Sequence, residues 1–236
     1  MSDQILGIWL PLVAAALVQA SFSLGVSMLT LLSGHLLSQE KSADRLNRLS
    51  VAYIFGSFIA ILSGLVGATY LLLHLSFAVD QKFWSVLAGV AVGVGLAVLL
   101  FYYRWGKGEK SGGTRLWLPR RAAEYLYART KATRHSFEAF ILGVAAVVAE
   151  LIFIIAPLAI AANLAVGLGG FAQVGAIFLY VVIAILPLII LFIANRRGAP
   201  LSAFQKWREQ NKKFLQIIAG LLLIILGFYL FIYKTL

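Results

Sequence analysis

Residues 137–166 read FEAFILGVAAVVAELIFIIAPLAIAANLAV, an apolar run with a carboxylate, Glu150, near its middle. A helix that crosses a bilayer needs about 20 mostly apolar residues, so this run is long enough to span a membrane. A carboxylate at membrane depth is costly unless it is neutral, paired or next to water, and such groups are functional by default. The segment therefore predicts a transmembrane helix that carries a functional acidic group.

The composition of the whole chain extends this prediction to an all-α membrane protein. Of its 236 residues, 61% are hydrophobic and 12% are charged, and the mean hydropathy is +0.93. Soluble domains average about 45–50% apolar and about 25% charged residues. The chain contains no cysteine, which excludes disulfides, thiolate metal sites and iron–sulfur clusters. We therefore expect neither a metal site nor a cofactor.

Six segments are long and apolar enough to cross the membrane. The first has no Lys or Arg before it and is longer than the core of a signal peptide, so we expect it to be retained. The predicted spans are residues 5–32, 51–77, 83–103, 137–166, 171–194 and 214–233.

The basic residues alternate from loop to loop. The first, third and fifth loops hold eighteen of the twenty Lys and Arg residues, and the second loop and the C-terminal tail hold the other two. Because strongly basic loops stay in the cytoplasm, both termini are predicted to be extracytoplasmic. This topology explains the net charge of +11, which therefore gives no indication of nucleic-acid binding. We expect an integral protein of a bacterial cytoplasmic membrane.

Two of the cytoplasmic segments mix aromatic and basic residues, as interfacial helices do. Pro119 can open a helix through residues 120–127, and Trp207 lies next to basic residues in the fifth loop. These short amphipathic segments are expected to bind anionic lipids at the cytoplasmic face. The alternative is that their charges only fix the orientation of the chain.

The two halves of the chain resemble each other. Residues 54–55 and 59–62 match residues 177–178 and 183–186, and residues 88–89 match residues 219–220. A repeat of three spans places its second copy in inverted orientation, which is typical of secondary transporters with a site near the midplane. We therefore predict a first three-helix repeat, a basic cytoplasmic linker with an interfacial helix, and a second three-helix repeat, in residues 1–103, 104–136 and 137–236.

In the register of this repeat, Gln19 of the first span corresponds to Glu150 of the fourth. Membrane burial disfavours a charged carboxylate, so Glu150 is expected to exchange a proton or bind a cation. The alternative is a neutral acid that holds two helices together. Ser23, Ser27 and Thr30 follow on one face of the first span, where they either line a substrate path or allow close helix packing.

Pro157 lies inside the fourth span, seven residues after Glu150. Proline removes a backbone hydrogen bond and clashes with the preceding turn, so we expect the helix to bend or break there. Broken helices near the midplane expose backbone groups that bind ions or substrates in transporters. Asn163 is a candidate to satisfy the groups that the break releases. A simple kink without a ligand is the alternative.

Short motifs of the chain resemble a known family of membrane proteins. Residues 27–34 (SMLTLLSG) resemble the end of the first helix in DsbD/CcdA-type membrane thiol carriers, and residues 140–143 followed by Pro157 resemble the start of their second half. These carriers belong with LysE-type exporters to a superfamily of six-helix, inverted-repeat proteins. The resemblance implies that scaffold and a polar pair of positions on the first and fourth helices. It does not imply electron transfer, because the cysteine of each half is missing here.

These features favour a small secondary transporter that moves a small solute or ion and is coupled to protons or cations through Glu150. The alternative is a non-transporting accessory or assembly subunit of a membrane complex, related to cytochrome c biogenesis-type proteins, with a second membrane protein or a second copy of the chain as partner. No nucleophile–base pattern is found, so an enzyme is not expected. The predicted binding residues are Glu150, Gln19, Ser23, Ser27, Thr30, Pro157 and Asn163.

Overall fold

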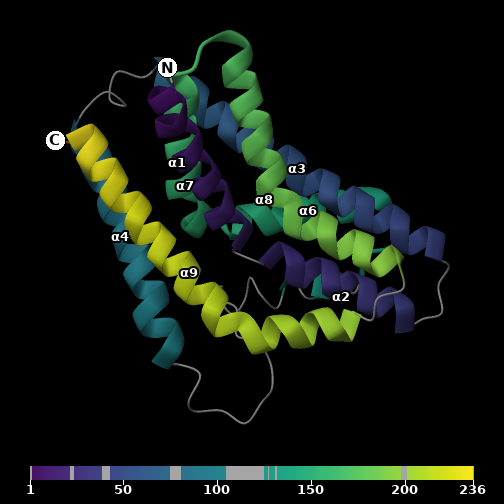
Figure 1. Cartoon of the computed structure of the whole chain (residues 1–236). Coiled ribbons are helices and arrows are strands. Elements are labelled where there is room, and N and C mark those ends of the chain that lie inside the picture. The colour runs from purple at the N-terminus through teal and green to yellow at the C-terminus, as the bar shows by residue number, and fades with distance from the viewer. Residues whose placement is uncertain are drawn as a thin grey trace.

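The computed structural model describes residues 2–21, 24–38, 43–74, 81–104, 125–126, 128–130, 132–197 and 201–235. The elements in these ranges are all helices, as the composition predicts, and they form an elongated bundle (Figure 1). They are α1 (Ser2–Ser21), α2 (Leu24–Ser38), α3 (Ala43–His74), α4 (Gln81–Arg104), α6 (Ser136–Ala149), α7 (Leu151–Val166), α8 (Gly170–Arg196) and α9 (Leu201–Thr235).

The length and composition of the helices are compatible with an integral membrane protein. Four of them are long and apolar enough to cross a membrane, and there are up to six spans if each of two bent helix pairs counts as one. The bundle also exposes many large apolar side chains, such as Val86, Ile152 and Ile225. So much exposed apolar surface is unusual for a protein that is surrounded by water.

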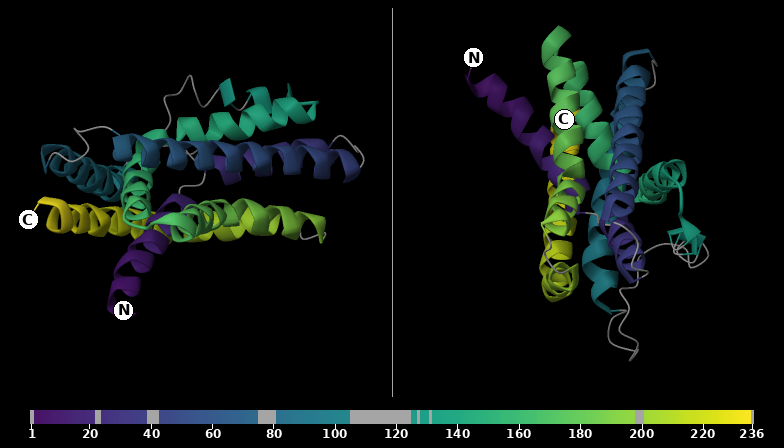
Figure 2. Two further views of the ribbon diagram at one scale, coloured as in Figure 1. Left: turned by 90° about the horizontal axis from the view of Figure 1, so that it is seen from above. Right: turned by 90° about the vertical axis from the view of Figure 1, so that its right-hand side faces the viewer.

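The fourth predicted span is two helices instead of one. α6 and α7 meet at Glu150 and are bent by 81° (Figure 2). The expectation that the helix breaks at Pro157 is wrong, because Pro157 is buried inside an unbroken α7. The reason lies in the packing: α6 runs along α3, whereas α7 turns away to pack against both α1 and α3. The chain therefore bends where its packing partners change.

The first predicted span is bent as well. The segments 7–21 and 25–33, which belong to α1 and α2, are inclined by 43° to each other on either side of residues 22–23. A single straight helix over residues 5–32 is therefore not what the structure shows. Gln19 lies in the last turn before this bend, much as Glu150 lies at the other bend.

The backbones of α3 and α6 are in contact where these helices cross. A Cβ atom on Gly56 would overlap the carbonyl group of Phe140, and a Cβ atom on Gly143 would overlap the carbonyl oxygen of Tyr53. Ser57 lies at the same crossing, and its hydroxyl is 3.3 Å from the carbonyl oxygen of Gly143, to which it can donate. Small residues allow this close approach of helices inside a membrane. The crossing fixes the direction of α6 up to Glu150.

A second close pair is formed by α4 and α9, which lie side by side along one flank of the bundle (Figure 1). A Cβ atom on Gly95 would lie 2.8 Å from the carbonyl oxygen of Gly220, and one on Gly227 would lie 2.6 Å from the side chain of Val92. Glycines on both helices therefore set the distance between them.

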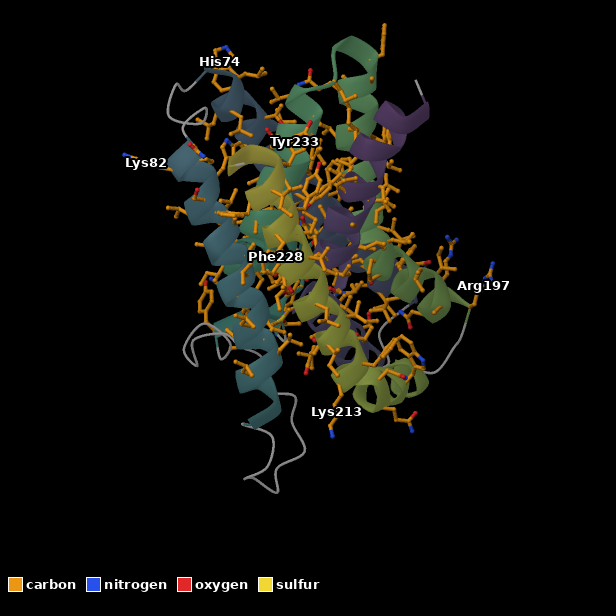
Figure 3. The ribbon with its side chains drawn as sticks, turned by 60° about the vertical axis from the view of Figure 1, so that its left-hand side comes forward. His74, Lys82, Arg197, Lys213, Phe228 and Tyr233 are labelled. Atoms are coloured by element: carbon orange, nitrogen blue, oxygen red, sulfur yellow. The ribbon has the colours of Figure 1, made fainter. Side chains whose placement is uncertain are left out.

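The two ends of the bundle carry different residues. Both termini lie at one end (Figure 1), with His74 and Lys82, whereas Lys213 lies toward the opposite end (Figure 3). Arg45, in the first turn of α3, donates a hydrogen bond of 3.2 Å to the carbonyl oxygen of Arg134, which precedes α6. This contact ties the starts of α3 and α6 together.

The buried apolar residues form two clusters, and the bent helices divide between them. The first cluster joins α1, α4, α7 and α9 with the second half of α3 and the first half of α8. The second cluster joins α2 and α6 with the first half of α3 and the second half of α8. Both bends therefore lie at the boundary between the two clusters. The unbroken helices α3 and α8 contribute to both clusters.

The predicted linker, residues 104–136, lies largely outside the described residues, and so do Pro119 and residues 120–124 of its predicted interfacial helix. In its described part, Leu126 belongs to the second cluster and Thr130 donates a hydrogen bond back to the carbonyl oxygen of Leu126. The amphipathic segment around Trp207 is continuous with the last span, because both belong to α9.

The α3–α6 crossing gives a test of the packing. Gly56→Ala is expected to destabilise the protein by about 1–3 kcal/mol, because the new methyl group meets backbone atoms, which cannot move aside as a side chain could. Gly67→Ala on the same helix is the matched control, since nothing lies within 4 Å of its Cβ position. Thermal unfolding in detergent would show a lower Tm for Gly56→Ala alone. Equal Tm values for the two variants would contradict the close crossing.

Candidate functional site

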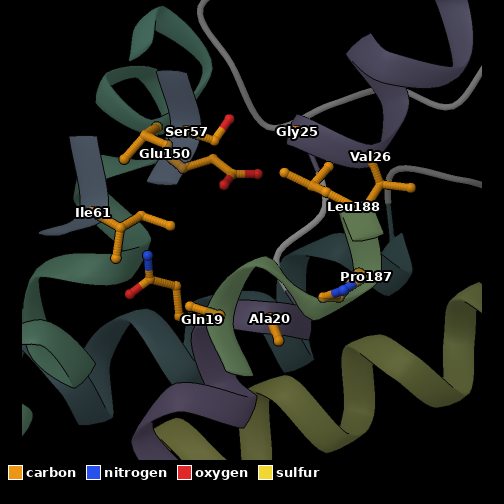
Figure 4. A pocket seen from close by; sticks show the side chains of 11 residues that line it. Gln19, Ala20, Gly25, Val26, Ser57, Ile61, Glu150, Pro187 and Leu188 are labelled. Carbon is orange, nitrogen blue, oxygen red and sulfur yellow. The ribbon is translucent and has the colours of Figure 1, made fainter. Parts of the chain in front are cut away.

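A cavity with three polar residues in a mostly apolar lining lies between the two apolar clusters, where the bent helices turn (Figure 4). It leaves about 30 Å³ for the centres of water-sized molecules. That is enough for about two waters, since about 10–15 Å³ holds one. The lining comes from α1, α2, α3, α6, α8 and the corner between α6 and α7. It comprises Gln19, Ala20, Gly25, Val26, Ser57, Ile61, Val147, Glu150, Ala184, Pro187 and Leu188.

Glu150 stands at the corner between α6 and α7, and its half-buried side chain points into the cavity (Figure 4). Its backbone remains fully hydrogen-bonded despite the bend. The amide donates to the carbonyl oxygens of Ala146 and Val147, at 3.2 and 3.1 Å, and the carbonyl accepts from Phe153 and Ile154, at 2.8 and 3.2 Å. The bend therefore turns the carboxylate into the cavity without leaving the backbone groups of Glu150 unsatisfied.

Gln19 lines the cavity from α1, across from Glu150 (Figure 4). It is 4% exposed, and Tyr180 of α8 donates a hydrogen bond to its side-chain oxygen Oε1. A buried amide needs such partners, because an unsatisfied polar group inside a protein costs stability. The structure thus brings together the two residues that the repeat register pairs, Gln19 and Glu150.

Two residues of α3, one in the lining and one that contacts the lining residue Gly25, add polar groups to this region. Ser57 lines it, with its hydroxyl 3.2 Å from the carbonyl oxygen of Tyr53 and 3.3 Å from that of Gly143. The fully buried Tyr53 donates a hydrogen bond of 3.0 Å to the carbonyl oxygen of Gly25. Its hydroxyl is also close enough to Glu150 for the two to interact electrostatically. Tyr53 therefore connects the start of α2 with the corner at Glu150.

The other predicted binding residues are placed elsewhere. Thr30 is buried and donates to the carbonyl oxygen of Val26 in its own helix, and Ser27 is half-buried on α2 outside the cavity lining. Pro157 is buried within α7 and Asn163 is half-buried near the end of that helix, so neither lines the cavity. Ser23 lies outside the described residues.

The sequence analysis missed Ser57, Tyr53 and Tyr180 as residues of this region. Each is a polar side chain inside an otherwise apolar span, which is a signal that the sequence does carry. Polar groups at this depth find partners across helices. Which of several such residues meet one another depends on how the helices pack, and only the structure supplies that.

No group of three or more His, Cys, Asp or Glu side chains that could hold a metal ion occurs in the part of the chain that the structure describes. Comparisons of the chain with protein-family models, with curated proteins and with solved structures find no match. The argument for function therefore rests on the cavity and its polar residues.

Removal of the Tyr53 hydroxyl tests how the cavity region is held together. Tyr53→Phe is expected to lower stability by about 1 kcal/mol, because the bond to the Gly25 carbonyl is lost inside the protein. The start of α2 should then exchange its amide hydrogens faster in hydrogen-exchange mass spectrometry. Tyr229→Phe on α9 is the control, as this tyrosine stacks on Tyr233 away from the cavity. Unchanged exchange in α2 would show that the hydrogen bond has no such role.

Proposed function

We propose that this protein is a small secondary transporter that moves a small solute or ion across a membrane, with Glu150 as the proton- or cation-binding group. The observation that carries the proposal is the position of the carboxylate. It lies at a helix break and lines a small cavity together with Gln19 and Ser57, in an otherwise strongly apolar bundle. An ionisable group at such a depth is retained at considerable cost, which is typical of ion and substrate pathways.

The division of the core supports this proposal. A transporter must close its site from each side in turn, and here one apolar cluster lies on each side of the cavity. The helices α1 and α7 belong to the first cluster, and their continuations α2 and α6 belong to the second. A movement at the two bends would therefore loosen one cluster while it leaves the other packed.

The helix contacts support an inverted repeat of three helices. The first helix of each proposed half packs against the second helix of the other half: α1 contacts α8, and α6 with α7 contacts α3. The third helices, α4 and α9, pack against each other. In addition, each half has one bent span, with Gln19 or Glu150 beside the bend. Discontinuous spans of this kind flank the sites of secondary transporters.

The charge distribution supports a membrane orientation with the basic end in the cytoplasm and both termini outside. Lys213 lies toward the end opposite the termini (Figure 3). The same end is suited to anionic lipid headgroups, because basic residues near a membrane surface attract them.

The orientation can be tested because the chain contains no cysteine. His74→Cys and Gln210→Cys each introduce a single exposed thiol, at the end with the termini and near Lys213 respectively. A membrane-impermeant maleimide applied to intact cells is expected to label the first variant and not the second. After the membrane is permeabilised, both should react. The reverse pattern would show the opposite orientation.

Transport itself can be tested through Glu150. Wild-type proteoliposomes on a solid-supported membrane are expected to give currents after jumps in protons, Na⁺, K⁺ or a panel of amino acids. Glu150→Gln should reduce the response about tenfold or more, since it removes the ionisable group at membrane depth. Glu138→Gln is the matched control, because Glu138 is an exposed capping residue whose role glutamine can fill.

Equal currents in wild type and Glu150→Gln would contradict the role of this residue. The absence of any current in wild type, together with co-purification of a stoichiometric membrane protein, would instead favour the accessory subunit.

A further inference from the structure

The hydrogen bond between Tyr180 and Gln19 decides which end of the Gln19 amide faces the cavity. Tyr180 is fully buried and its hydroxyl donates to Oε1 of Gln19. One of the two acceptor positions of the oxygen is thus engaged by Tyr180, and the amide NH₂ group points to the side of the cavity on which Glu150 lies (Figure 4). An amide carries two donor hydrogens on its nitrogen and accepts only on its oxygen. Gln19 therefore presents a hydrogen-bond donor to the species in the cavity.

The rest of the lining also suits a neutral, water-like occupant. Glu150 is the ionisable residue of the lining, and Ser57 is its hydroxyl residue. The hydroxyl of Ser57 lies within hydrogen-bond distance of two backbone carbonyl groups, which compete for its single proton. A metal cation takes several oxygen ligands, whereas the wall opposite the carboxylate presents the hydrogens of an NH₂ group. A water molecule can accept from Gln19 and also exchange a proton with Glu150.

We propose that the exchangeable ion at this site is a proton, carried to Glu150 through one or two waters, and that an alkali metal ion is not bound there. Tyr180 is the positioning residue that enforces this choice by holding the Gln19 amide with its nitrogen toward the cavity. The inference rests on the proposed function, because it names the ion that the transporter would couple to.

The proton step is a simple transfer between oxygens. A hydronium ion that enters the cavity gives one proton to the carboxylate of Glu150, so an O–H bond breaks on hydronium and one forms on the carboxyl group. A neutral water remains, hydrogen-bonded to Gln19. The reverse transfer releases the proton when the other side opens. The net charge of the cavity is zero after protonation, which favours movement of the bound state through an apolar barrier.

The described groups around the cavity that approach Glu150 are a tyrosine and uncharged residues. The titratable group that approaches it from α3 is Tyr53. The cavity residues of α1, α2 and α8 are Gln19, Ala20, Gly25, Val26, Ala184, Pro187 and Leu188, and none of them carries a charge.

Infrared difference spectroscopy of the purified protein tests the proposal without any transport. The C=O band of the protonated Glu150 carboxyl group is expected to disappear as pH rises and to be missing in Glu150→Gln. The midpoint should stay constant when Na⁺ or K⁺ replaces N-methylglucamine at fixed ionic strength. A competing cation would lower the midpoint by about one pH unit for each tenfold increase in its concentration, because binding of the ion displaces the proton. Such a shift, or a band that does not titrate, would overturn the proposal.

Tyr180→Phe tests the positioning role. Without the hydroxyl the Gln19 amide can turn its oxygen to the cavity, so the midpoint is expected to become dependent on Na⁺ or K⁺. Gln19→Glu should give the same dependence, because it places a second carboxylate opposite the first. Tyr229→Phe is the control and should behave as wild type. If the midpoint stays independent of Na⁺ and K⁺ in both Tyr180→Phe and Gln19→Glu, these two residues do not select the ion.

The titration tests the identity of the ion and the current measurements test transport, so either proposal can be contradicted while the other stands. A wild-type midpoint that shifts with Na⁺ or K⁺ would overturn the proton assignment and leave the transporter in place. A cation-independent midpoint together with no Glu150-dependent current would remove the transporter and leave a proton-binding site.

Discussion

The contact between the backbones of α3 and α6 is the constraint on which the rest of the structure depends. Gly56 and Gly143 let the carbonyl groups of one helix approach the Cα atoms of the other. This contact holds α6 along the first half of α3, so the chain must turn by 81° to let α7 reach α1. The corner of that turn is Glu150. The position of the carboxylate thus depends on two glycines at the crossing: Gly143, about two turns before Glu150 on α6, and Gly56 opposite it on α3.

The turn also explains why the core is divided. A straight fourth helix would contribute to both apolar clusters, as the unbroken helices α3 and α8 do. Because it is bent, α6 and α7 each belong to one cluster, and α1 and α2 are divided in the same way. The boundary between the clusters is where the polar residues meet. Apolar packing there is incomplete, which leaves room for water beside the carboxylate.

The transporter and the accessory subunit make different demands on this boundary. A subunit that only packs against a partner needs no cavity beside its carboxyl group. Here the carboxylate faces a space of water size, lined on the far side by an amide that a buried tyrosine holds in place. Such pre-arranged polar groups around a small space are what binding of a small species requires. The cavity is therefore the observation on which our proposal of transport rests.

Sequence reasoning reached the helical membrane class and the pairing of Gln19 with Glu150. Both follow from properties that are local in the chain: the length of apolar runs, and a polar residue at a matching depth in each half. It was wrong about where the fourth span bends. Pro157 has the strongest local tendency to break a helix, but α7 continues through it, and the span divides at Glu150.

The sequence by itself determined that these residues form apolar helices with a carboxylate and an amide inside two of the apolar segments, because hydrophobic periodicity and length act within each segment. Only the tertiary structure decided that Tyr180 holds the amide, that Ser57 and Tyr53 join the site, and that Thr30, Pro157 and Asn163 lie outside it. Those outcomes depend on which helices are in contact, and on the residues along each helix at which the contact is made. That is set by glycine contacts between segments far apart in the chain, which no local pattern encodes.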